Sequence, residues 1–296
     1  MKIFNGNYSN GLANKIVNEL NKKNDLQKKY YISQLNIDTF SDGEILPIFK
    51  ESVREEDIYF VQSTISSDSI METLLTIDAA KRAGCKSFTL VAPFQGYSRQ
   101  DKVDHLRSSI GSKLLADILD KAGISKMITI DLHSSAIQGF YNKPIIHLNG
   151  TKIFTDYIKN INDLTILSPD QGAVGKASEF CREFPNANFA MINKKRKKPN
   201  EIHSMELVGV VKDKNVIIVD DLVDTGGTLK KAANLITDNG AKSVRALATH
   251  GVLSGNAYKN IEESKLTELL ISDSIKKDNI TTDKIKQISC AKVLSD

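Results

Sequence analysis

Three carboxylates and two threonines surround a Gly-Gly pair in the stretch Val216–Thr228. Asp220 and Asp221 follow four apolar, β-favouring residues, and the loop then continues as Asp224, Thr225, Gly226, Gly227 and Thr228. Adjacent carboxylates can accept hydrogen bonds from sugar hydroxyls. A glycine-rich loop that leads into a helix presents backbone N–H groups, which bind phosphate. The stretch therefore predicts a site for a phosphorylated sugar.

The loop differs from the two common nucleotide-binding loops. The chain has no G-x-x-x-x-G-K-[ST] sequence, and no G-x-G-x-x-G follows a predicted strand. The chief alternative is a tight turn without a ligand, for which a Gly-Gly pair would suffice. Carboxylates at the buried end of a strand are costly without a ligand, and this favours the binding interpretation.

Two further segments place chemistry-bearing side chains after a predicted strand. Asp170 follows Ser168-Pro169, where proline and the nearby Gly172 favour a turn. Its alternative role is that of a helix N-cap. Asp131-Leu132-His133 brings an imidazole next to a carboxylate, which makes His133 a candidate metal or phosphate ligand, although a lone histidine is more often a packing residue.

Five successive cations, Lys194 to Lys198, form the most basic run of the chain. A solvated loop is one interpretation, and a localisation or nucleic-acid patch is another. A third is a mobile basic flap that closes over a polyphosphate and neutralises charge in the transition state. Spacing alone does not decide among the three.

Two loop segments combine an aromatic residue with hydrogen-bonding groups. The first contains Phe40, Asp42, Gly43 and Glu44, and the second, Tyr97–Asp101, contains Arg99 and Gln100. Such groups suit a purine, because the ring can stack on an aromatic face while polar atoms contact its edge. Each segment taken singly is a weak indication.

Strand-like and helix-like segments alternate along the chain and must position these residues. Predicted strands cover 58–62, 87–92, 127–132, 164–167, 189–192, 216–219 and 244–249, and predicted helices cover 70–83, 112–122, 173–183 and 229–239. Such alternation predicts an α/β fold with mainly parallel sheets flanked by helices. A faint internal similarity between 122–133 and 239–250 indicates two similar domains, 1–149 and 150–296.

Composition restricts the classes of protein to consider. Charged residues make up 26% of the 296 residues and hydrophobic ones 41%, as in ordinary globular proteins. A net charge of +4, scattered along the chain, does not indicate a nucleic-acid partner. No apolar run approaches membrane-spanning length, and the polar N-terminus is not typical of a signal peptide. Three distant cysteines match no disulfide framework and fit a reducing cytoplasm.

Taken together, the segments resemble the ribose-phosphate pyrophosphokinase family, whose members make phosphoribosyl pyrophosphate. The resemblance runs from about Phe40 to Ser272, and the motifs occur in the family's order. They are the segments 40–44, 96–101, 131–133 with 137–140, 168–170, 194–196, 220–228 and 248–255. The family's fold would be two phosphoribosyltransferase-like domains, the first holding the ATP base and the second holding ribose 5-phosphate and the catalytic loop.

The resemblance also implies a role for each matching residue. Lys194 and Arg196 would be catalytic, and Arg196 would also bind substrate. His133 and Asp170 would be the Mg²⁺ positions. Asp220 and Asp221 would bind the ribose hydroxyls, and the loop from Asp224 would bind the 5-phosphate. ATP would be bound by Phe40, Asp42, Gly43, Glu44, Arg99 and Gln100. Of these, Phe40, Asp42 and Glu44 would reach the ATP base from a neighbouring subunit.

The implied reaction is transfer of the β,γ-pyrophosphoryl group of ATP to the C1 hydroxyl of ribose 5-phosphate, with release of AMP. The product would supply nucleotide biosynthesis in the cytoplasm. The family would make the assembly a homo-oligomer, a hexamer of dimers. From the composition we expect no nucleic-acid or membrane partner. Alternatives are a phosphoribosyltransferase, which shares the 220–228 motif, and a non-catalytic regulatory relative of the synthetase.

The chain departs from the family pattern at three places. The segment 170–176 has Ala173 in place of a usual glycine and Lys176 in place of a usual arginine. The loops 65–69 and 105–111 are shorter than in the family. In the family the second loop lies near the site where phosphate activates and ADP inhibits, so we expect weakened or absent phosphate dependence.

Overall fold

The computed structural model describes residues 1–9, 11–23, 29–198 and 201–296, and for residues 194–204 it describes no side chains. Contacts divide the chain into two compact units. The first consists of 1–150, 274–276 and 289–296, and the second of 151–273 and 277–288. The last eight residues thus belong to the first unit. The two domains predicted from the sequence, 1–149 and 150–296, stay a prediction.

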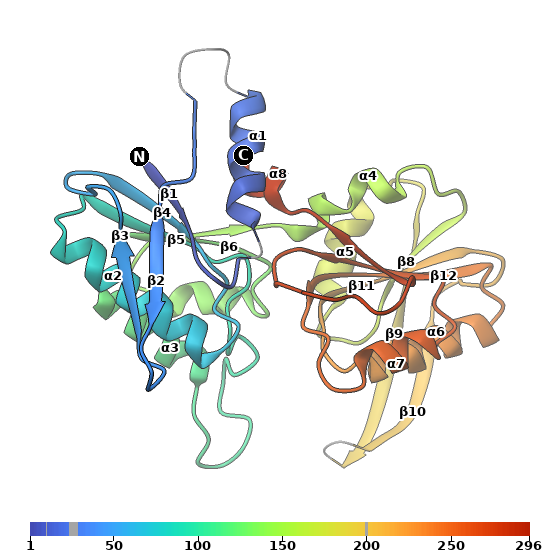
Figure 1. The fold of residues 1–296 in the computed structure, drawn as a ribbon. Helices are drawn as coiled ribbons and strands as arrows, with labels where there is room; N and C mark the ends of the chain where they lie inside the picture. The colour runs from blue at the N-terminus through green and yellow to red at the C-terminus, as the bar shows by residue number, and fades with distance from the viewer. Residues whose placement is uncertain (10, 24–28, 199–200) are drawn as a thin grey trace. The chain divides into compact units, whose positions relative to one another are not determined.

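The first unit is built on a five-stranded parallel sheet in the order β1-β4-β5-β6-β7 (Figure 1). Its strands are β1 (Lys2–Asn5), β4 (Asp57–Val61), β5 (Ser87–Val91), β6 (Lys126–Ile130) and β7 (Ile145–Leu148). Its helices are α1 (Leu12–Lys23), α2 (Ser67–Arg82), α3 (Gly111–Ala122), η1 (Ser135–Phe140) and α8 (Ala291–Ser295). An antiparallel hairpin of β2 (Leu35–Thr39) and β3 (Ile45–Phe49) packs near α2.

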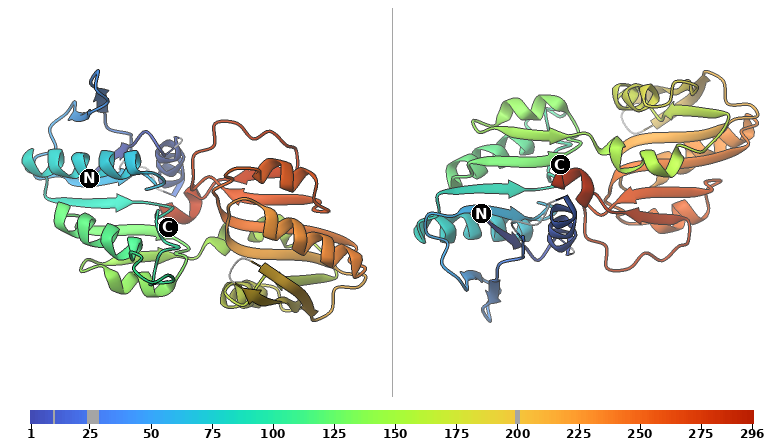
Figure 2. Two further views of the ribbon diagram at one scale, coloured as in Figure 1. Left: turned by 90° about the horizontal axis from the view of Figure 1, so that it is seen from below. Right: turned by 90° about the horizontal axis from the view of Figure 1, so that it is seen from above.

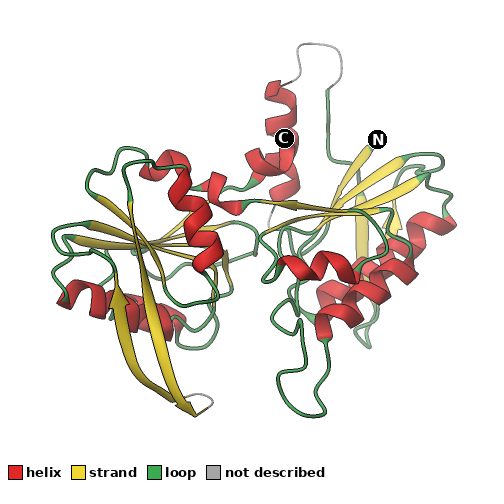
Figure 3. Ribbon diagram, turned by 180° about the vertical axis from the view of Figure 1, so that it is seen from behind, coloured by secondary structure: helices red, strands yellow, loops and turns green. Residues whose placement is uncertain are grey.

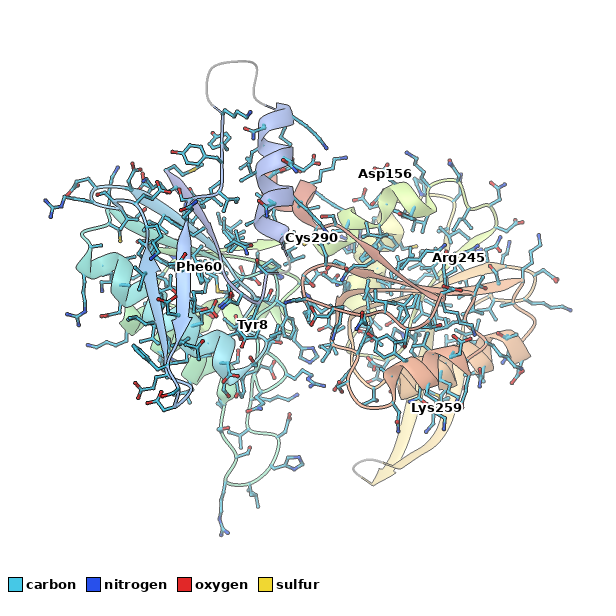
Figure 4. All side chains as sticks on the ribbon, viewed as in Figure 1. Tyr8, Phe60, Asp156, Arg245, Lys259 and Cys290 are labelled. Carbon is cyan, nitrogen blue, oxygen red and sulfur yellow. The ribbon has the colours of Figure 1, made fainter. Side chains whose placement is uncertain are left out.

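Helices cover both faces of this sheet, which is why its strands are apolar on both sides. Figure 2 shows α1 and α8 on one face, and α2 and α3 on the other. Phe60 of β4 is fully buried among the core side chains (Figure 4). Helix α2 begins with a capping box between Ser66 and Ser69, which satisfies two backbone groups at its start.

The second unit is built on a seven-stranded sheet in the order β10-β9-β8-β11-β12-β13-β14. Its strands are β8 (Leu164–Ser168), β9 (Asn188–Lys198), β10 (Glu201–Val208), β11 (Asn215–Val223), β12 (Ser243–Gly251), β13 (Glu268–Ser272) and β14 (Ile285–Ile288). All pairings are parallel except β9 with β10. Its helices are η2 (Gly150–Ile153), α4 (Thr155–Ile158), α5 (Val174–Arg182), α6 (Gly227–Asp238) and α7 (Ala257–Glu262).

Helices α6 and α7 pack together against one face of this sheet, and α5 packs against β8 and β11 on the other (Figures 1 and 2). The core is aliphatic, with fully buried Val216, Ile236 and Leu269. At the flank of the sheet, the guanidinium of Arg245 donates to Glu268 at 2.9 Å (Figure 4). The predicted α/β fold with two mainly parallel, helix-flanked sheets is confirmed.

Two local predictions were wrong. The strand carrying the acids does not end at Val219 but runs to Val223, because β12 continues to pair with it as far as Gly251. The basic run does not lie between strands but within β9, because 201–208 return antiparallel and complete its backbone ladder. Figure 3 shows this two-stranded ribbon projecting beyond the rest of its sheet.

No helix in the described ranges is both long enough and apolar enough to cross a membrane.

Candidate active site

The loop between β11 and α6 has the geometry of an anion cradle. Among the residues that the structure describes, no group accepts a hydrogen bond from the backbone N–H of Thr225, Gly226, Gly227 or Thr228. These four donors precede or begin the 12-residue helix α6, whose positive N-terminal dipole also favours an anion. These N–H groups are available to an anion at the start of α6, and their binding of a phosphate stays a prediction.

Backbone conformation requires a glycine at Gly226. Its φ is +72°, in the left-handed region, and it is the N-cap of α6. A Cβ there would lie 3.3 Å from the carbonyl oxygen of Ala257 and 3.3 Å from Ile261 Cδ1. The Asn260 side chain from α7 also donates to the Thr225 carbonyl at 2.9 Å. Helix α7 thus holds the back of the loop, a contribution that the sequence did not reveal.

Asp220 and Asp221 lie near the carboxyl end of β11, where its pairing with β8 has stopped. The β8 ladder ends at the pair Ile218–Leu167, so the acids have a strand neighbour only on the β12 side. Burial raises the pKa of Asp220 well above its ordinary value, and the nearby Asp221 and Asp170 carboxylates raise it further. The Asp221 N–H donates to Asp220 Oδ1 at 2.9 Å.

Asp170 lies in the turn between β8 and α5 and approaches the same acids. Its Oδ1 accepts from the N–H groups of Gly172 at 3.1 Å and Ala173 at 3.3 Å. The alternative role of helix N-cap was wrong, because the N-cap of α5 is Ala173. The Asp170 side chain instead orders the turn before α5, and its carboxylate acts electrostatically on Asp220. Lys176, on α5, donates to Thr249 at 3.0 Å.

A cavity of about 190 Å³ collects most of these predicted groups in the second unit. Its lining comes from the β8–α5 turn, from β11, from the loop before α6 and from β12. The predicted site residues on its wall are Asp170, Asp220, Asp224, Thr225, Gly226 and Thr228. Such a cavity can hold one sugar phosphate. The carboxylates can accept hydrogen bonds from its hydroxyls, and the N–H groups can donate to its phosphate.

His133 lies in the first unit, on an ordered turn after β6. The turn begins at Asp131, which has a positive φ of 42° and accepts from the Gly150 N–H at 3.1 Å. Nε2 of His147, on β7, accepts from the Leu132 N–H at 2.9 Å. His133 itself is exposed. The sequence did not indicate that His147 supports this turn, because no spacing rule links His147 to Leu132, 15 positions earlier.

The predicted ATP segments also lie in the first unit. Phe40–Glu44 forms the β2–β3 turn, closed by bonds from Phe40 N to Glu44 O at 2.7 Å and from Gly43 N to Phe40 O at 3.0 Å. The Phe40 ring is 53% exposed and so is accessible for stacking. Gly43 has a φ of +93°, and Asp42 accepts from the Glu44 N–H at 3.0 Å.

Arg99 and Gln100 are exposed and follow a tightly packed backbone segment. A Cβ on Gly96 would lie 2.0 Å from the Thr64 carbonyl oxygen, so only glycine fits there. Gln100 accepts from the Ser112 N–H through its backbone oxygen at 3.2 Å, which ties it to the start of α3. Local packing therefore fixes the backbone that presents both side chains.

Lys194 and Arg196 lie on β9 beyond its pairing with β8, which ends at Met191. Their backbones pair with Met205 and Ile202 of β10, and their side chains lie outside the described part of the chain. The structure thus places the predicted catalytic pair on a two-stranded ribbon. Whether the ribbon moves over a substrate stays a prediction.

Comparisons with known proteins identify the family. Residues 1–123 match the N-terminal domain of ribose phosphate pyrophosphokinase, and residues 176–296 match the phosphoribosyl synthetase-associated domain. A ribose-phosphate pyrophosphokinase of Porphyromonas gingivalis is 43% identical over 92% of this chain and 86% of its own length. One of Clostridium perfringens is 40% identical over 100% of this chain and 92% of its own.

The chain belongs to the ribose-phosphate pyrophosphokinase family. The crystal structure of phosphoribosylpyrophosphate synthetase from Mycobacterium smegmatis superposes with a TM-score of 0.89 at 33% identity, covering 99% of this chain and 96% of that one. The resemblance seen in the sequence is therefore confirmed over the full length. Family membership makes the chain an enzyme of nucleotide biosynthesis.

Proposed function

We propose that this chain transfers the β,γ-pyrophosphoryl group of ATP to the C1 hydroxyl of ribose 5-phosphate, giving phosphoribosyl pyrophosphate and AMP. The observation that carries the proposal is the cavity of the second unit, where the four unpaired N–H groups of 225–228 and the carboxylates of Asp220 and Asp170 lie together. A phosphate at the N–H groups would orient the sugar so that its hydroxyls reach the acids.

In this reaction the C1 oxygen bonds to the β-phosphorus, and the bond from that phosphorus to the α,β-bridging oxygen breaks. The electron pair of the broken bond stays on AMP, and the hydroxyl proton is lost to solvent. No covalent enzyme intermediate is required, so the residues act by positioning the reactants and by stabilising charge. We assign that charge stabilisation to Lys194 and Arg196.

Mg²⁺ is the cofactor that fits the donor set. In the described part of the chain, no three His, Cys, Asp or Glu side chains form a cluster that could hold a metal alone. Mg²⁺ usually takes one or two protein carboxylates together with substrate phosphates, and Asp170 supplies such a carboxylate. We propose Asp170 and His133 as Mg²⁺ positions, each within its own unit. When bound with ATP, the ion would neutralise the charge on the phosphate oxygens.

Two assays separate this proposal from its alternatives. The protein is incubated with Mg²⁺, ATP and ribose 5-phosphate, and AMP, ADP and inorganic pyrophosphate are measured. AMP release that depends on the sugar supports the synthetase. Consumption of phosphoribosyl pyrophosphate with a free base, without use of ATP, would indicate a phosphoribosyltransferase. Inactivity in both assays would indicate a non-catalytic regulatory relative.

We further propose a homo-oligomer, a hexamer of dimers, in which Phe40, Asp42 and Glu44 complete the ATP site of a neighbouring subunit. The exposed Phe40 ring on the β2–β3 turn supports this arrangement. If sites are shared, an Asp42→Ala, Glu44→Ala double variant mixed with a Lys194→Ala variant should recover activity that neither has alone. Mixtures with no recovered activity after subunit exchange would contradict the shared site.

We propose a reducing cytoplasm as the location. Cys85, Cys181 and Cys290 form no disulfide, and burial raises the pKa of Cys85 and Cys181 above the ordinary value. Cys290 is fully buried at the start of α8 (Figure 4). Thiols held protonated in this way react slowly.

A further inference from the structure

Lys277 occupies a position that neither the motifs nor the proposed reaction explains. It follows β13, in the segment that leads to β14, and its side chain is half-buried. Its ammonium group donates a hydrogen bond to the carbonyl oxygen of Val252, in the loop after β12. A lysine stem that turns its charged end inward, toward one backbone carbonyl, loses hydration and needs a compensating interaction.

The loop that Lys277 contacts holds the start of the phosphate loop. Leu253 N donates to the Val223 carbonyl at 3.1 Å, and Ser254 N donates to the Asp224 carbonyl at 3.2 Å. The Ser254 hydroxyl also donates to the Asp224 carboxylate. Residues 252–254 therefore act as a clamp on Val223 and Asp224, and Lys277 is bonded to the first residue of this clamp.

Charge is the second link between Lys277 and the phosphate loop. The Asp224 carboxylate lies on the wall of the cavity, where it would repel the dianion of a sugar phosphate. Burial lowers the pKa of Lys277, and the nearby Asp224 carboxylate opposes that change, so the two charges interact. An ammonium group at this position offsets the negative charge that Asp224 brings to an anion site.

We propose that Lys277 is a positioning residue for the phosphate group of the sugar substrate. It holds the 252–254 clamp and neutralises Asp224, so that the N–H groups of 225–228 meet a phosphate dianion without net repulsion. This inference rests on the proposed function, because it assigns ribose 5-phosphate to the cavity of the second unit.

The test compares Lys277→Met, Lys277→Gln and Lys277→Arg with the wild-type protein. Calorimetry gives the Kd for ribose 5-phosphate, and steady-state kinetics gives kcat and both KM values. Lys277→Met and Lys277→Gln should raise the Kd and the KM for ribose 5-phosphate about two- to five-fold, the effect of losing a partly exposed charge interaction. Their kcat and their KM for ATP should change less than twofold, and Lys277→Arg should restore most of the affinity.

Lys284→Met is the matched control. Lys284 also donates to backbone carbonyls, those of Glu262 at 2.8 Å and Ser264 at 2.9 Å, and it belongs to the same segment of the chain. Lys284→Met should lower the Tm by about as much as Lys277→Met, but it should leave the Kd for ribose 5-phosphate unchanged. Equal weakening of sugar-phosphate binding in the control would show a merely structural effect and overturn the inference.

The outcomes also separate this inference from the proposed function. If wild-type protein binds ribose 5-phosphate and the neutral variants bind it equally well, the role of Lys277 is refuted and the proposed function stands. If wild-type protein binds no ribose 5-phosphate, both are refuted. A folded Lys277→Gln protein suffices for the test if Lys277→Met does not fold.

Discussion

At the scale of single residues, the site depends on where side chains are absent as much as on where they are present. Gly226 lets the chain enter the left-handed region against Ala257 and Ile261, so that α6 can start close to α7. Gly96 allows contact with the Thr64 carbonyl and so fixes the backbone before Arg99. At both positions glycine is required because a Cβ would be strained or would clash, and neither glycine contacts a substrate through a side chain.

A Gly226→Ala substitution tests this explanation. The strained φ and the two 3.3 Å contacts should lower the free energy of unfolding by about 1–2 kcal/mol and should raise the KM for ribose 5-phosphate. Gly175→Ala in α5 is the control, since a Cβ there meets nothing within 4 Å and helix propensity should stabilise the protein by about 0.5–1 kcal/mol. Urea unfolding measures both, and equal effects at the two positions would contradict the account.

Lys194 is the residue on which the proposed chemistry depends most. Lys194→Ala should lower kcat by about 10²–10⁴-fold, the range for a group that stabilises transition-state charge, while the Kd for ribose 5-phosphate stays within about twofold. Lys198→Ala removes the same charge at the end of β9 and should change kcat far less. Near-normal turnover of the Lys194 variant would refute its catalytic role.

At the scale of elements, β11 shows how a sheet creates a site. Its neighbour β8 stops pairing at Leu167, whereas β12 continues to Gly251, so one side of β11 opens just where Asp220 and Asp221 occur. Ligands of open α/β sheets bind at such carboxyl ends because helices and loops leave space there. The β9–β10 ribbon extends an edge of the same sheet and carries the basic run.

An ion pair links β1 to the residues that follow β3 and gives a pH-dependent stability. The Lys2 ammonium donates to Glu51, and this bond is the main reason that the pKa of Glu51 is lower than its ordinary value. Because the folded-state pKa lies below the unfolded value, the stabilisation is complete above the unfolded pKa. It is lost as the pH falls through the folded-state pKa.

Glu51→Gln should therefore lower the Tm at pH 7, and the difference from wild type should shrink progressively as the pH falls below about 4. Glu19→Gln, which removes an exposed pair with Lys22 inside α1, should have almost no effect at either pH. Thermal melts between pH 3 and pH 7 measure the difference. A Glu51 effect that is independent of pH would exclude the ion pair as its cause.

At the scale of the whole molecule, the two units divide the proposed work. The second unit holds the cavity for the sugar phosphate, and the first holds the segments assigned to ATP and the His133 turn. The last helix, α8, belongs to the first unit and packs against α1, although the strand before it belongs to the second. The chain thus crosses between the units more than once.

Regulation is the property that the shortened loops should change. Ser66 already caps α2, which leaves little chain between β4 and that helix, and 105–111 leads directly into α3. We expect activity in phosphate-free buffer to be within about twofold of that at saturating phosphate. Assays in a non-phosphate buffer with added orthophosphate check this, and a steep requirement for phosphate would contradict it.

Sequence alone determined much of the fold and most of the cavity. Buried strands, glycine caps and the 220–228 motif are local patterns, and local backbone rules convert them into strands, helices and a phosphate loop. The resemblance of the motifs predicted the family, and the comparisons confirmed that family. Strand ends were less predictable, as the extension of β11 to Val223 shows, because the neighbouring strand decides where pairing stops.

Only the tertiary structure revealed the residues that act from a distance in the sequence. His147 reaches Leu132, Asn260 reaches Thr225, and Lys277 reaches Val252, each through a single hydrogen bond between separate elements. No spacing rule connects such pairs, since they meet only when sheets and helices pack. The sequence determined which chemistry the chain can do, and the packing decided which other residues support it.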